Sequence, residues 1–213
     1  FNILNKFASR VGGLTVGFVP YDGGMSAVEI KTALKNKKLK VLFLIEADDF
    51  QINDNDLGDV FIIYIGHHGD RFAGIADIIL PTSAFAEKKA LYLNLEGRPQ
   101  FTKVVISKPG VAVDSWKVFK ALDQKLSSVI KFNNYEELLK AMFIEYPLLQ
   151  NKKYFQKEKW IMEKNSNFTL SSEVNNFLEE NFYQTCSISR SSENMANCVR
   201  DILKLKKRNN GTT

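Results

Sequence analysis

Residue types that enzymes use for catalysis and metal binding follow one another directly after an apolar segment. Gly66 leads into His67 and His68, the only two histidines of the chain, and Asp70 follows. Two imidazoles and a carboxylate could bind a metal ion, and either imidazole could act as a general base. Adjacent side chains of an extended segment point in opposite directions, and no further ligand set accompanies them. The favoured interpretation is therefore a tight glycine-containing turn in which one histidine is hydrogen-bonded to the backbone.

A second polar group lies at the start of the next apolar segment. Asp77 could face a cleft, or its carboxylate could accept a hydrogen bond from the backbone of a neighbouring strand. The backbone role is the favoured one. Pro81 closes this segment and has no N–H, so we expect strand pairing to end there.

A third set of polar residues follows: Glu87, Asn94, Glu96, Arg98 and Gln100. The guanidinium of Arg98 could form two parallel hydrogen bonds with a carboxylate, which either glutamate could supply, or it could hold a phosphate. No glycine-rich phosphate loop precedes a predicted helix. A buried internal ion pair is therefore favoured over phosphate binding.

Three apolar segments must position these groups: Val41–Ile45, Val60–Ile65 and Asp77–Leu80. Continuous apolar runs of this length are typical of strands that are buried on both faces of a parallel sheet. Each run ends in small or polar residues, and helical patterns surround them. The sequence thus predicts an α/β fold, with a Rossmann-like, mostly parallel sheet, flanking helices and a helical C-terminal tail.

Other elements can be predicted from local patterns. A helix near the start is expected to weaken or end at Gly12-Gly13. The remaining predictions are a helix over Met25–Leu34, strands at Leu91–Asn94 and Val104–Ile106, and helices that begin near Asp114, near Asn134 and near Ser192. The segment Ser187–Ser192 could cap the last helix, which is the favoured role, or be phosphorylated.

The pattern of residue types changes after Pro147. This predicts two regions: an α/β domain over residues 1–147 and an extended helical tail over 148–213. The tail is too small to build a core of its own. We expect it to pack on the body or on a partner chain.

Composition limits the function further. The chain has 213 residues, 45% of them hydrophobic, a net charge of +5 and a pI of about 9.0. No nucleic-acid recognition motif accompanies the basic charge, so nucleic acid is not an expected partner. No apolar run approaches the roughly 18 residues of a membrane-spanning helix. Cys186 and Cys198 form no CxxC pair, so no iron–sulfur or zinc ligand set is expected in this chain.

The order of these residues resembles known families. The spacing from Ala76-Asp77 through Leu80-Pro81 and Glu87 to Asn94-x-Glu96-Gly97-Arg98-x-Gln100 resembles the signature of the molybdopterin oxidoreductase superfamily. Three further segments resemble the C-terminal part of the large iron–sulfur subunit of respiratory complex I: Phe61–Asp70, Ser187–Arg190 and Met195–Val199. The resemblance extends from about Asn2 to Val199. It departs from the catalytic members at Ala90, where they usually have glycine.

The resemblance implies a fold and a role in assembly, and no cofactor in this chain. Iron–sulfur clusters and FMN are expected in partner chains. Catalytic, cofactor-binding and metal-binding residues are not expected, and the signature is expected to be structural: Gly66, His67, His68, Asp70, Asp77, Pro81, Glu87, Asn94, Glu96, Arg98 and Gln100.

The expected function is a non-catalytic, structural part of complex I, NADH:ubiquinone oxidoreductase, and one half of a split subunit. Its expected partners are other peripheral-arm subunits, including the cysteine-rich half and the flavin-bearing NADH-binding subunit. The expected place is the matrix side of the mitochondrial inner membrane, or the cytoplasmic side of a bacterial plasma membrane. Two alternatives stay open: part of a true molybdopterin-dependent oxidoreductase, and a basic nucleic-acid-binding module.

Overall fold

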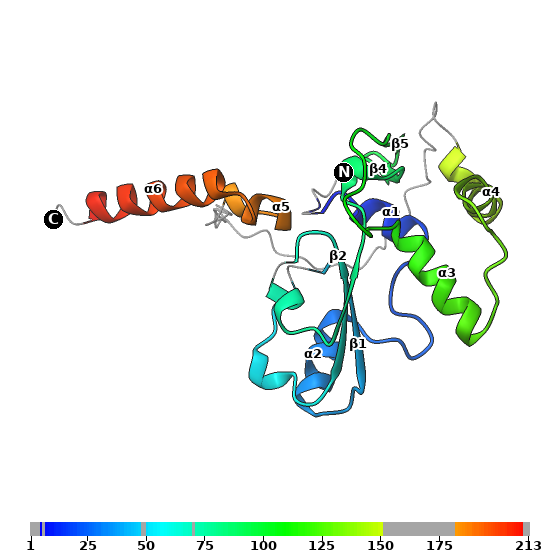
Figure 1. Cartoon of the computed structure of the whole chain (residues 1–213), viewed down its shortest axis with the longest axis horizontal. Helices are drawn as coiled ribbons and strands as arrows, with labels where there is room; N and C mark the ends of the chain where they lie inside the picture. The colour runs from blue at the N-terminus through cyan, green and yellow to red at the C-terminus, as the bar shows by residue number, and fades with distance from the viewer. Residues whose placement is uncertain (1–4, 6, 48–49, 70, 151–181, 211–213) are drawn as a thin grey trace, which may run out of the picture. The chain divides into compact units, whose positions relative to one another are not determined.

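The computed structural model describes residues 5, 7–47, 50–69, 71–150 and 182–210 (Figure 1). The chain divides into two compact units, residues 1–155 and 156–213. The first unit combines strands and helices, and the described part of the second is helical.

A three-stranded parallel sheet forms the centre of the first unit. Its strands are β1 (Val41–Ile45), β2 (Phe61–Gly66) and β3 (Ile78–Pro81), in the order β1-β2-β3. The register pairs each residue of β1 with the residue twenty positions later in β2, beginning with Val41 and Phe61. The three predicted strands and their parallel arrangement are confirmed.

One face of this sheet carries the hydrophobic core. The helix α2 (Ala27–Lys35) and the short 3-10 helix η2 (Arg71–Gly74) contribute to it, as do Ile52 and Leu57 on either side of the 3-10 helix η1 (Asp54–Asp56). The buried members of this core are Leu34, Leu42, Leu44, Ile52, Leu57, Ile62, Tyr64 and Phe72. The core therefore joins the strands to the segments that connect them.

The helix α2 begins where the sequence supplies a complete N-terminal cap. The backbone N–H of Glu29 donates to Ser26 Oγ at 3.3 Å, and the backbone N–H of Ser26 donates to Glu29 Oε2 at 2.7 Å. This reciprocal pair satisfies two N–H groups that a helix start leaves without intrahelical partners. The predicted helix over Met25–Leu34 is confirmed.

The opposite face of the sheet differs from the prediction. Along β1, buried and exposed residues alternate, and the side chains of Val41, Phe43 and Ile45 are 48%, 43% and 41% exposed. Burial on both faces was expected from the continuous apolar run. It occurs at the carboxyl end of β2, where the neighbouring residues Tyr64 and Ile65 are 1% and 0% exposed, but not along β1, because the segments that lead into β1, β2 and β3 contribute to one core.

A small antiparallel hairpin follows the sheet. Its strands are β4 (Leu91–Leu93) and β5 (Pro99–Phe101), and a single 3-10 turn, η3 (Phe85–Glu87), precedes it. The second strand thus begins at Pro99, and the strand predicted at Val104–Ile106 is wrong. The backbone N–H groups of Val105 and Ile106 instead both donate to the carbonyl oxygen of Ala86, at 2.8 and 3.2 Å.

The first helix, α1 (Arg10–Thr15), contains the two glycines that were expected to weaken or end it. The helix continues through both glycines. Gly12 packs next to Leu93 of β4, and a Cβ atom added at Gly12 would meet Leu93 Cδ1 at an ordinary contact distance of 3.5 Å.

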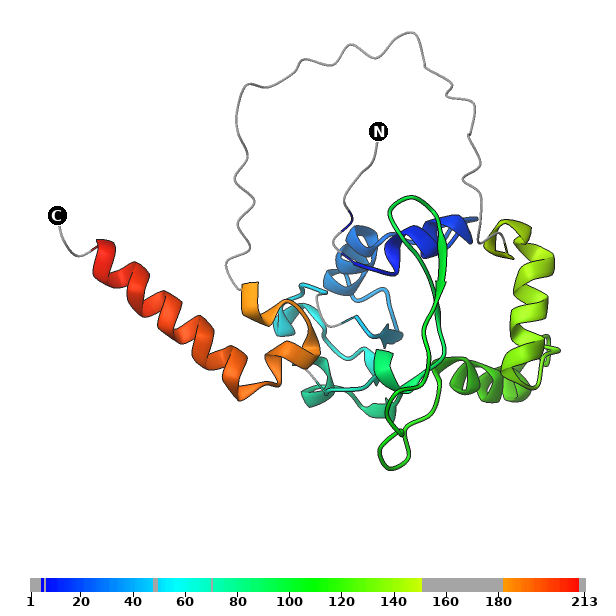
Figure 2. The same cartoon turned by 90° about the horizontal axis from the view of Figure 1, so that it is seen from above.

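Two longer helices complete the first unit and lie at its outer side (Figure 2). They are α3 (Ser115–Leu126) and α4 (Tyr135–Glu145), followed by the 3-10 helix η4 (Pro147–Gln150). Asn134 caps α4 by accepting a hydrogen bond from the N–H of Glu137 at 2.8 Å. Asp114 precedes α3, but its side chain makes no cap hydrogen bond. The Tyr146 hydroxyl, just after α4, donates to the carbonyl oxygen of Val16 at 3.0 Å.

The described part of the second unit consists of the 3-10 helix η5 (Phe182–Gln184), the short helix α5 (Ser187–Arg190) and the long helix α6 (Glu193–Asn210). The final helix predicted near Ser192 is confirmed. The N–H of Met195 donates to Ser192 Oγ at 3.4 Å, which agrees with the predicted capping role of this segment. None of the described helices is both long and apolar enough to cross a membrane.

Candidate functional site

The carboxyl ends of the three parallel strands meet at one edge of the sheet, where α/β proteins usually bind their ligands. This edge carries Glu46 after β1, Gly66 with the histidine pair after β2, and Thr82 and Ser83 after β3. Its contacts decide whether a ligand site is present.

The histidine pair forms a turn in which the two rings face each other. Nδ1 of His67 lies 2.6 Å from Nδ1 of His68, and the ring planes are nearly perpendicular, at 86°. One Nδ1 therefore donates to the other, which fixes complementary tautomers. The turn was predicted, but the mutual contact was not, because extended geometry would have turned the rings apart. Asp70, predicted beside them, lies outside the described residues.

Gly66 is needed because an aromatic ring occupies the space beside it. A Cβ atom at Gly66 would overlap the phenol group of Tyr64, whose side chain is only 1% exposed. The Tyr64 ring thus fills the end of β2. A side chain packed in this way leaves no room for a ligand directly at this strand end.

An ion pair holds the end of β1. Nζ of Lys88 lies 2.8 Å from Oε1 of Glu46, and the two side chains are 16% and 34% exposed. Glu46 adopts a left-handed backbone conformation, with φ of 47°, and its N–H donates to the carbonyl oxygen of Ile65 at 2.8 Å. Sequence reasoning missed this pair. The available signal was a single carboxylate directly after an apolar strand.

The end of β3 is also occupied by internal contacts. Pro81 pairs with Gly66, and the N–H of Thr82 still donates to the carbonyl oxygen of Gly66 at 2.9 Å. This hydrogen bond completes the Gly66–Pro81 pair, which is the last pair of β2 with β3, so strand pairing ends at Pro81 as predicted. Ser83 Oγ donates to Asp114 Oδ1 at 3.2 Å, and Asp114 also pairs with Lys108 at 2.6 Å.

One polar atom at this edge has no partner within the described part of the chain. Thr82 is 1% exposed, and its hydroxyl oxygen makes no hydrogen bond to any described residue. A single buried hydroxyl of this kind does not form a binding site.

Asp77 lies at the opposite, amino edge of the sheet and has the structural role that the sequence favoured. Its Oδ2 accepts a hydrogen bond from the N–H of Ile62 at 2.7 Å, and its own N–H donates to the carbonyl oxygen of Ile62 at 2.9 Å. The carboxylate extends the pairing of β3 with β2 beyond the strand itself. This prediction is confirmed.

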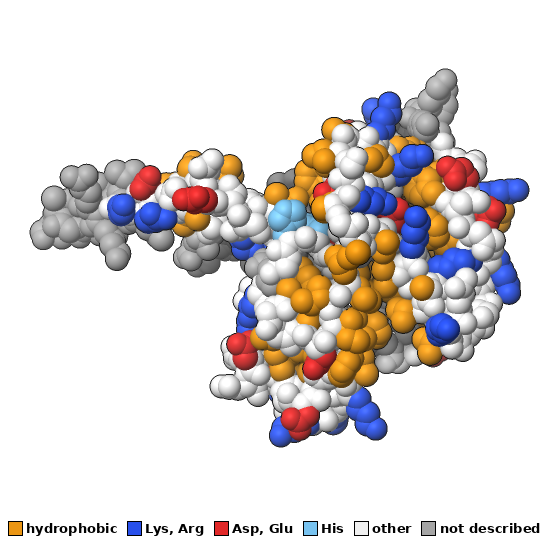
Figure 3. All heavy atoms as spheres, viewed as in Figure 1, with side chains coloured by type: hydrophobic (Ala, Val, Ile, Leu, Met, Phe, Trp, Pro, Cys, Tyr) orange, Lys and Arg blue, Asp and Glu red, His pale blue; other side chains and the backbone are white. Residues whose placement is uncertain are grey.

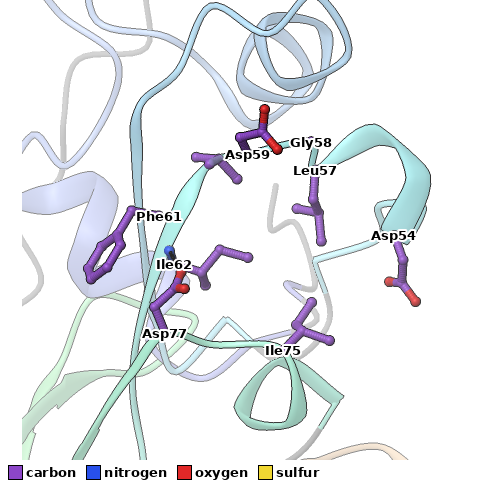
Figure 4. A pocket seen from close by; sticks show the side chains of 9 residues that line it. Asp54, Leu57, Gly58, Asp59, Phe61, Ile62, Ile75 and Asp77 are labelled. Atoms are coloured by element: carbon purple, nitrogen blue, oxygen red, sulfur yellow. Dashed lines mark hydrogen bonds between the residues drawn. The ribbon is translucent and has the colours of Figure 1, made fainter.

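A cavity of about 380 Å³ opens beside Asp77 at this amino edge (Figure 4). Its acidic lining residues are Asp54, Asp59 and Asp77, and its apolar ones include Ile62 and Ile75. It lies at the end of the sheet away from the histidine pair. The nearby guanidinium of Arg71 donates to Asp54 and to the carbonyl oxygen of Ile52. The cavity is therefore an acidic recess beside a structural carboxylate.

The third predicted polar set lies around the hairpin and does not join the histidines in one site. Glu87 Oε2 accepts a hydrogen bond from the N–H of Ala84 at 3.0 Å. Asn94 Oδ1 accepts from the N–H groups of Glu96 and Arg98, at 3.0 and 2.9 Å, and so shapes the turn between β4 and β5.

An ion pair of Arg98 would not be buried as expected, since Arg98 and Glu96 are both exposed at the hairpin turn. Gln100 is also exposed and faces Tyr92 across the two strands. These residues thus belong to the β4–β5 hairpin and its turn. Their spacing in the sequence alone could not reveal this hairpin.

The residues at these positions do not fit an anionic, phosphate-bearing pterin. The carboxyl edge is occupied by side chains that bind one another, and the cavity at the amino edge is lined by three aspartates, one of which, Asp54, is paired with Arg71. Within the described ranges, histidine, cysteine, aspartate and glutamate nowhere form a group of three that could hold a metal ion.

The two cysteines belong to the second unit. Cys186 is exposed and precedes α5, and Cys198 is half-buried in α6. The Ser189 side chain, whose Oγ lies 3.4 Å from Cys186 Sγ, and the Ser189 backbone lower the pKa of the Cys186 thiol. Both thiols are free.

Two family models match this chain. Residues 1–125 match the model described as molybdopterin oxidoreductase, and residues 158–198 match a model of the C-terminal region of an NADH-ubiquinone oxidoreductase subunit. The two matches fall in different units of the structure. Both units therefore carry family-specific sequence.

Curated relatives extend the similarity over nearly the whole chain. The mitochondrial NADH-ubiquinone oxidoreductase 78 kDa subunit of Neurospora crassa is 38% identical over 210 residues, which cover 93% of this chain and 26% of the relative. The 75 kDa subunit of Reclinomonas americana is 36% identical, over 93% of this chain and 28% of the relative. An NADH-quinone oxidoreductase subunit of Rickettsia felis is 35% identical, over 93% and 27%.

The chain thus spans about a quarter of the length of the curated relatives it matches. More than half of it matches one family model, and the named relatives are all subunits of NADH-ubiquinone or NADH-quinone oxidoreductases. The chain belongs to the molybdopterin oxidoreductase family and is similar to the C-terminal part of the large iron–sulfur subunit of respiratory complex I.

Proposed function

We propose that this chain is a non-catalytic, structural part of the large peripheral-arm subunit of NADH:ubiquinone oxidoreductase. The observation that carries the proposal is the occupied carboxyl edge of the sheet. There the Tyr64 ring fills the end of β2. The Glu46–Lys88 ion pair lies at the end of β1, and the Lys108–Asp114 ion pair lies near the end of β3. Side chains that satisfy one another stabilise a fold and offer no open ligand position.

The electrons would pass through cofactors held by other chains. Iron–sulfur clusters and FMN would belong to partner subunits, and this chain would bind none of them. Its two cysteines support this part of the proposal, because cluster ligation usually requires four thiolates in a characteristic spacing. The role left to this chain is to hold neighbouring subunits in position.

The finer part of the proposal is a split subunit, in which the cysteine-rich iron–sulfur half is a separate polypeptide. The partners would be this half, the flavin-bearing NADH-binding subunit and other peripheral-arm subunits. The place would be the matrix side of the mitochondrial inner membrane, or the cytoplasmic side of a bacterial plasma membrane. The named relatives, one mitochondrial and one bacterial, support the choice of these two compartments but not the side of the membrane.

Native isolation of the assembly that contains this chain tests the proposal. Mass spectrometry of the co-migrating chains should find flavin-bearing and cysteine-rich complex I subunits, the latter as a separate polypeptide. A complex with one contiguous large subunit would refute the split. A reading frame that continues upstream of Phe1 into the cysteine-rich domain would refute it as well.

A true molybdopterin-dependent oxidoreductase is the second candidate, and the family model over residues 1–125 is the observation that favours it. Metal analysis of the same assembly separates the two. Iron without molybdenum or tungsten supports the complex I role. Stoichiometric molybdenum or tungsten supports the second candidate, with most of its binding site on another chain.

A further inference from the structure

The outward face of the three-stranded sheet is apolar and is left partly uncovered by the described part of the chain. Because side chains alternate along a strand, the register gives the residues of this face. They are Val41, Phe43, Ile45, Phe61, Ile63, Ile65, Ile78 and Leu80. We call this set the outward face. None of its eight members is polar, whereas a solvent-facing sheet side normally alternates polar with apolar residues.

Exposure on this face is large except at the carboxyl end of β2, where Ile65 is fully buried. Phe43, Phe61 and Ile78 are 43%, 41% and 42% exposed, one on each strand. In the space-filling view, hydrophobic side chains gather in a stripe over β1 and β2 (Figure 3). Parallel sheets occur almost only with both faces covered, so a stripe of this size indicates a contact surface.

The free edge of β1 continues this surface. The N–H of Phe61 donates to the carbonyl oxygen of Lys40 at 2.9 Å, and the N–H of Glu46 donates to that of Ile65 at 2.8 Å. The even-numbered residues of β1 therefore direct their backbone N–H and C=O groups toward β2. In a parallel ladder, the odd-numbered residues of β1 direct theirs to the opposite side. On that side β1 pairs with no strand of the described chain, so Val41, Phe43 and Ile45 present both apolar side chains and backbone groups.

The chain path tells which element belongs at this edge. Leu34 of α2, Leu57 before β2 and Phe72 before β3 all enter the same core, so the segments leading into the three strands lie on one face. Right-handed crossovers on one face step across a sheet in one direction. A strand that precedes α2 in such a sheet lies beyond β1. The described residues before α2 contain the helix α1 and no strand.

We propose that polypeptide from the remainder of the same subunit covers both the free edge and the outward face. It adds a strand parallel to the free edge of β1 and packs the apolar stripe of an amphipathic helix on the outward face. This inference rests on the proposed function, because it takes the rest of the subunit as the partner. The relatives have the required length, since this chain accounts for only 26–28% of them. A second copy of this chain, related by two-fold symmetry, would instead pair two β1 edges antiparallel.

Site-directed photo-crosslinking in the native assembly tests this inference. Phe43→p-benzoyl-phenylalanine places the probe on the outward face, and Val28→p-benzoyl-phenylalanine is the matched control, on α2 and 73% exposed. The Phe43 probe should cross-link to peptides that align with the large subunit of the relatives outside the quarter matched by this chain. Cross-links to this chain itself, to an unrelated subunit or to none would overturn the proposal.

A charge substitution gives a second measurement. Phe43→Glu should lower the fraction of the chain that co-migrates with the assembly by about tenfold or more, because it buries an unpaired charge at the interface. Val28→Glu should leave that fraction unchanged. The circular dichroism of free Phe43→Glu chain should match that of the wild type, and its thermal midpoint should lie at most about 4 °C lower. Unchanged co-migration of the Phe43→Glu variant would overturn the proposal.

The two proposals can fail separately. If the chain co-migrates with cysteine-rich complex I subunits while Phe43 cross-links elsewhere, the docking proposal fails and the proposed function stands. If the chain co-migrates with no complex I subunit, both fail.

Discussion

The two faces of the three-stranded sheet are equally apolar in sequence but differ in the structure. On the covered face, Tyr64 is 1% exposed and contacts a core that includes Phe72, which is 0% exposed. On the outward face, Val41 and Phe43 are 48% and 43% exposed. The difference teaches that the apolar content of a strand reflects the whole assembly in which it is buried. The chain's own described helices account for only one face.

Replacing one phenylalanine on each face tests this contrast most directly. Phe72→Ala should lower the free energy of unfolding by about 3–5 kcal/mol, because it leaves a cavity in the core. Phe43→Ala should lower it by only about 0.5–1 kcal/mol in the isolated chain, since much of this ring already faces water. Urea unfolding of the purified variants measures both values. Equal losses would show that the outward face is covered in the isolated chain.

The amino edge of the sheet allows a second test, because one carboxylate there replaces a backbone partner. Asp77→Ala should lower the free energy of unfolding by about 1–3 kcal/mol, since it leaves the N–H of Ile62 without its acceptor. Asp59→Ala is the matched control. It lines the same cavity, and the structure shows no hydrogen bond from its side chain to a described residue. A loss as large for Asp59 would mean that the cavity's charge, rather than this hydrogen bond, sets the stability.

The sequence predicted the strands well because their apolar runs are continuous and each is bounded by polar residues. It also predicted the backbone hydrogen bond of Asp77, because an aspartate at a strand start lies within reach of the neighbouring strand's backbone. It did not predict that the outward face would remain exposed, because burial depends on elements that the strand itself does not encode.

The polar groups were harder to predict. The contact between His67 and His68 depends on a local turn, and the exposed position of Arg98 depends on the hairpin that Asn94 closes. The Glu46–Lys88 pair joins residues 42 positions apart, so it follows from tertiary packing alone. Spacing in the sequence did not reveal the partners of these residues.

The covered face depends on α2, and its N-terminal cap offers a smaller test. Ser26→Ala should lower the free energy of unfolding by about 1 kcal/mol, because it removes the acceptor of the Glu29 N–H. Ser9→Ala is the control, since Ser9 also precedes a helix but its side chain makes no cap hydrogen bond. If both substitutions cost the same, the cap of α2 contributes nothing specific to the covered face.

The smallest expected effect is a pH dependence at the same cap. The Ser26 side chain and then its backbone N–H lower the pKa of Glu29 in the folded chain. A carboxyl with a lowered folded-state pKa contributes stability above its unfolded pKa and loses it as the pH falls through the folded value. Wild-type chain should therefore lose slightly more stability than Glu29→Gln between neutral and acidic pH, as measured by urea unfolding at each pH. Identical pH profiles would show that the covering helix is held to the sheet by core packing alone, with no contribution from its charged cap.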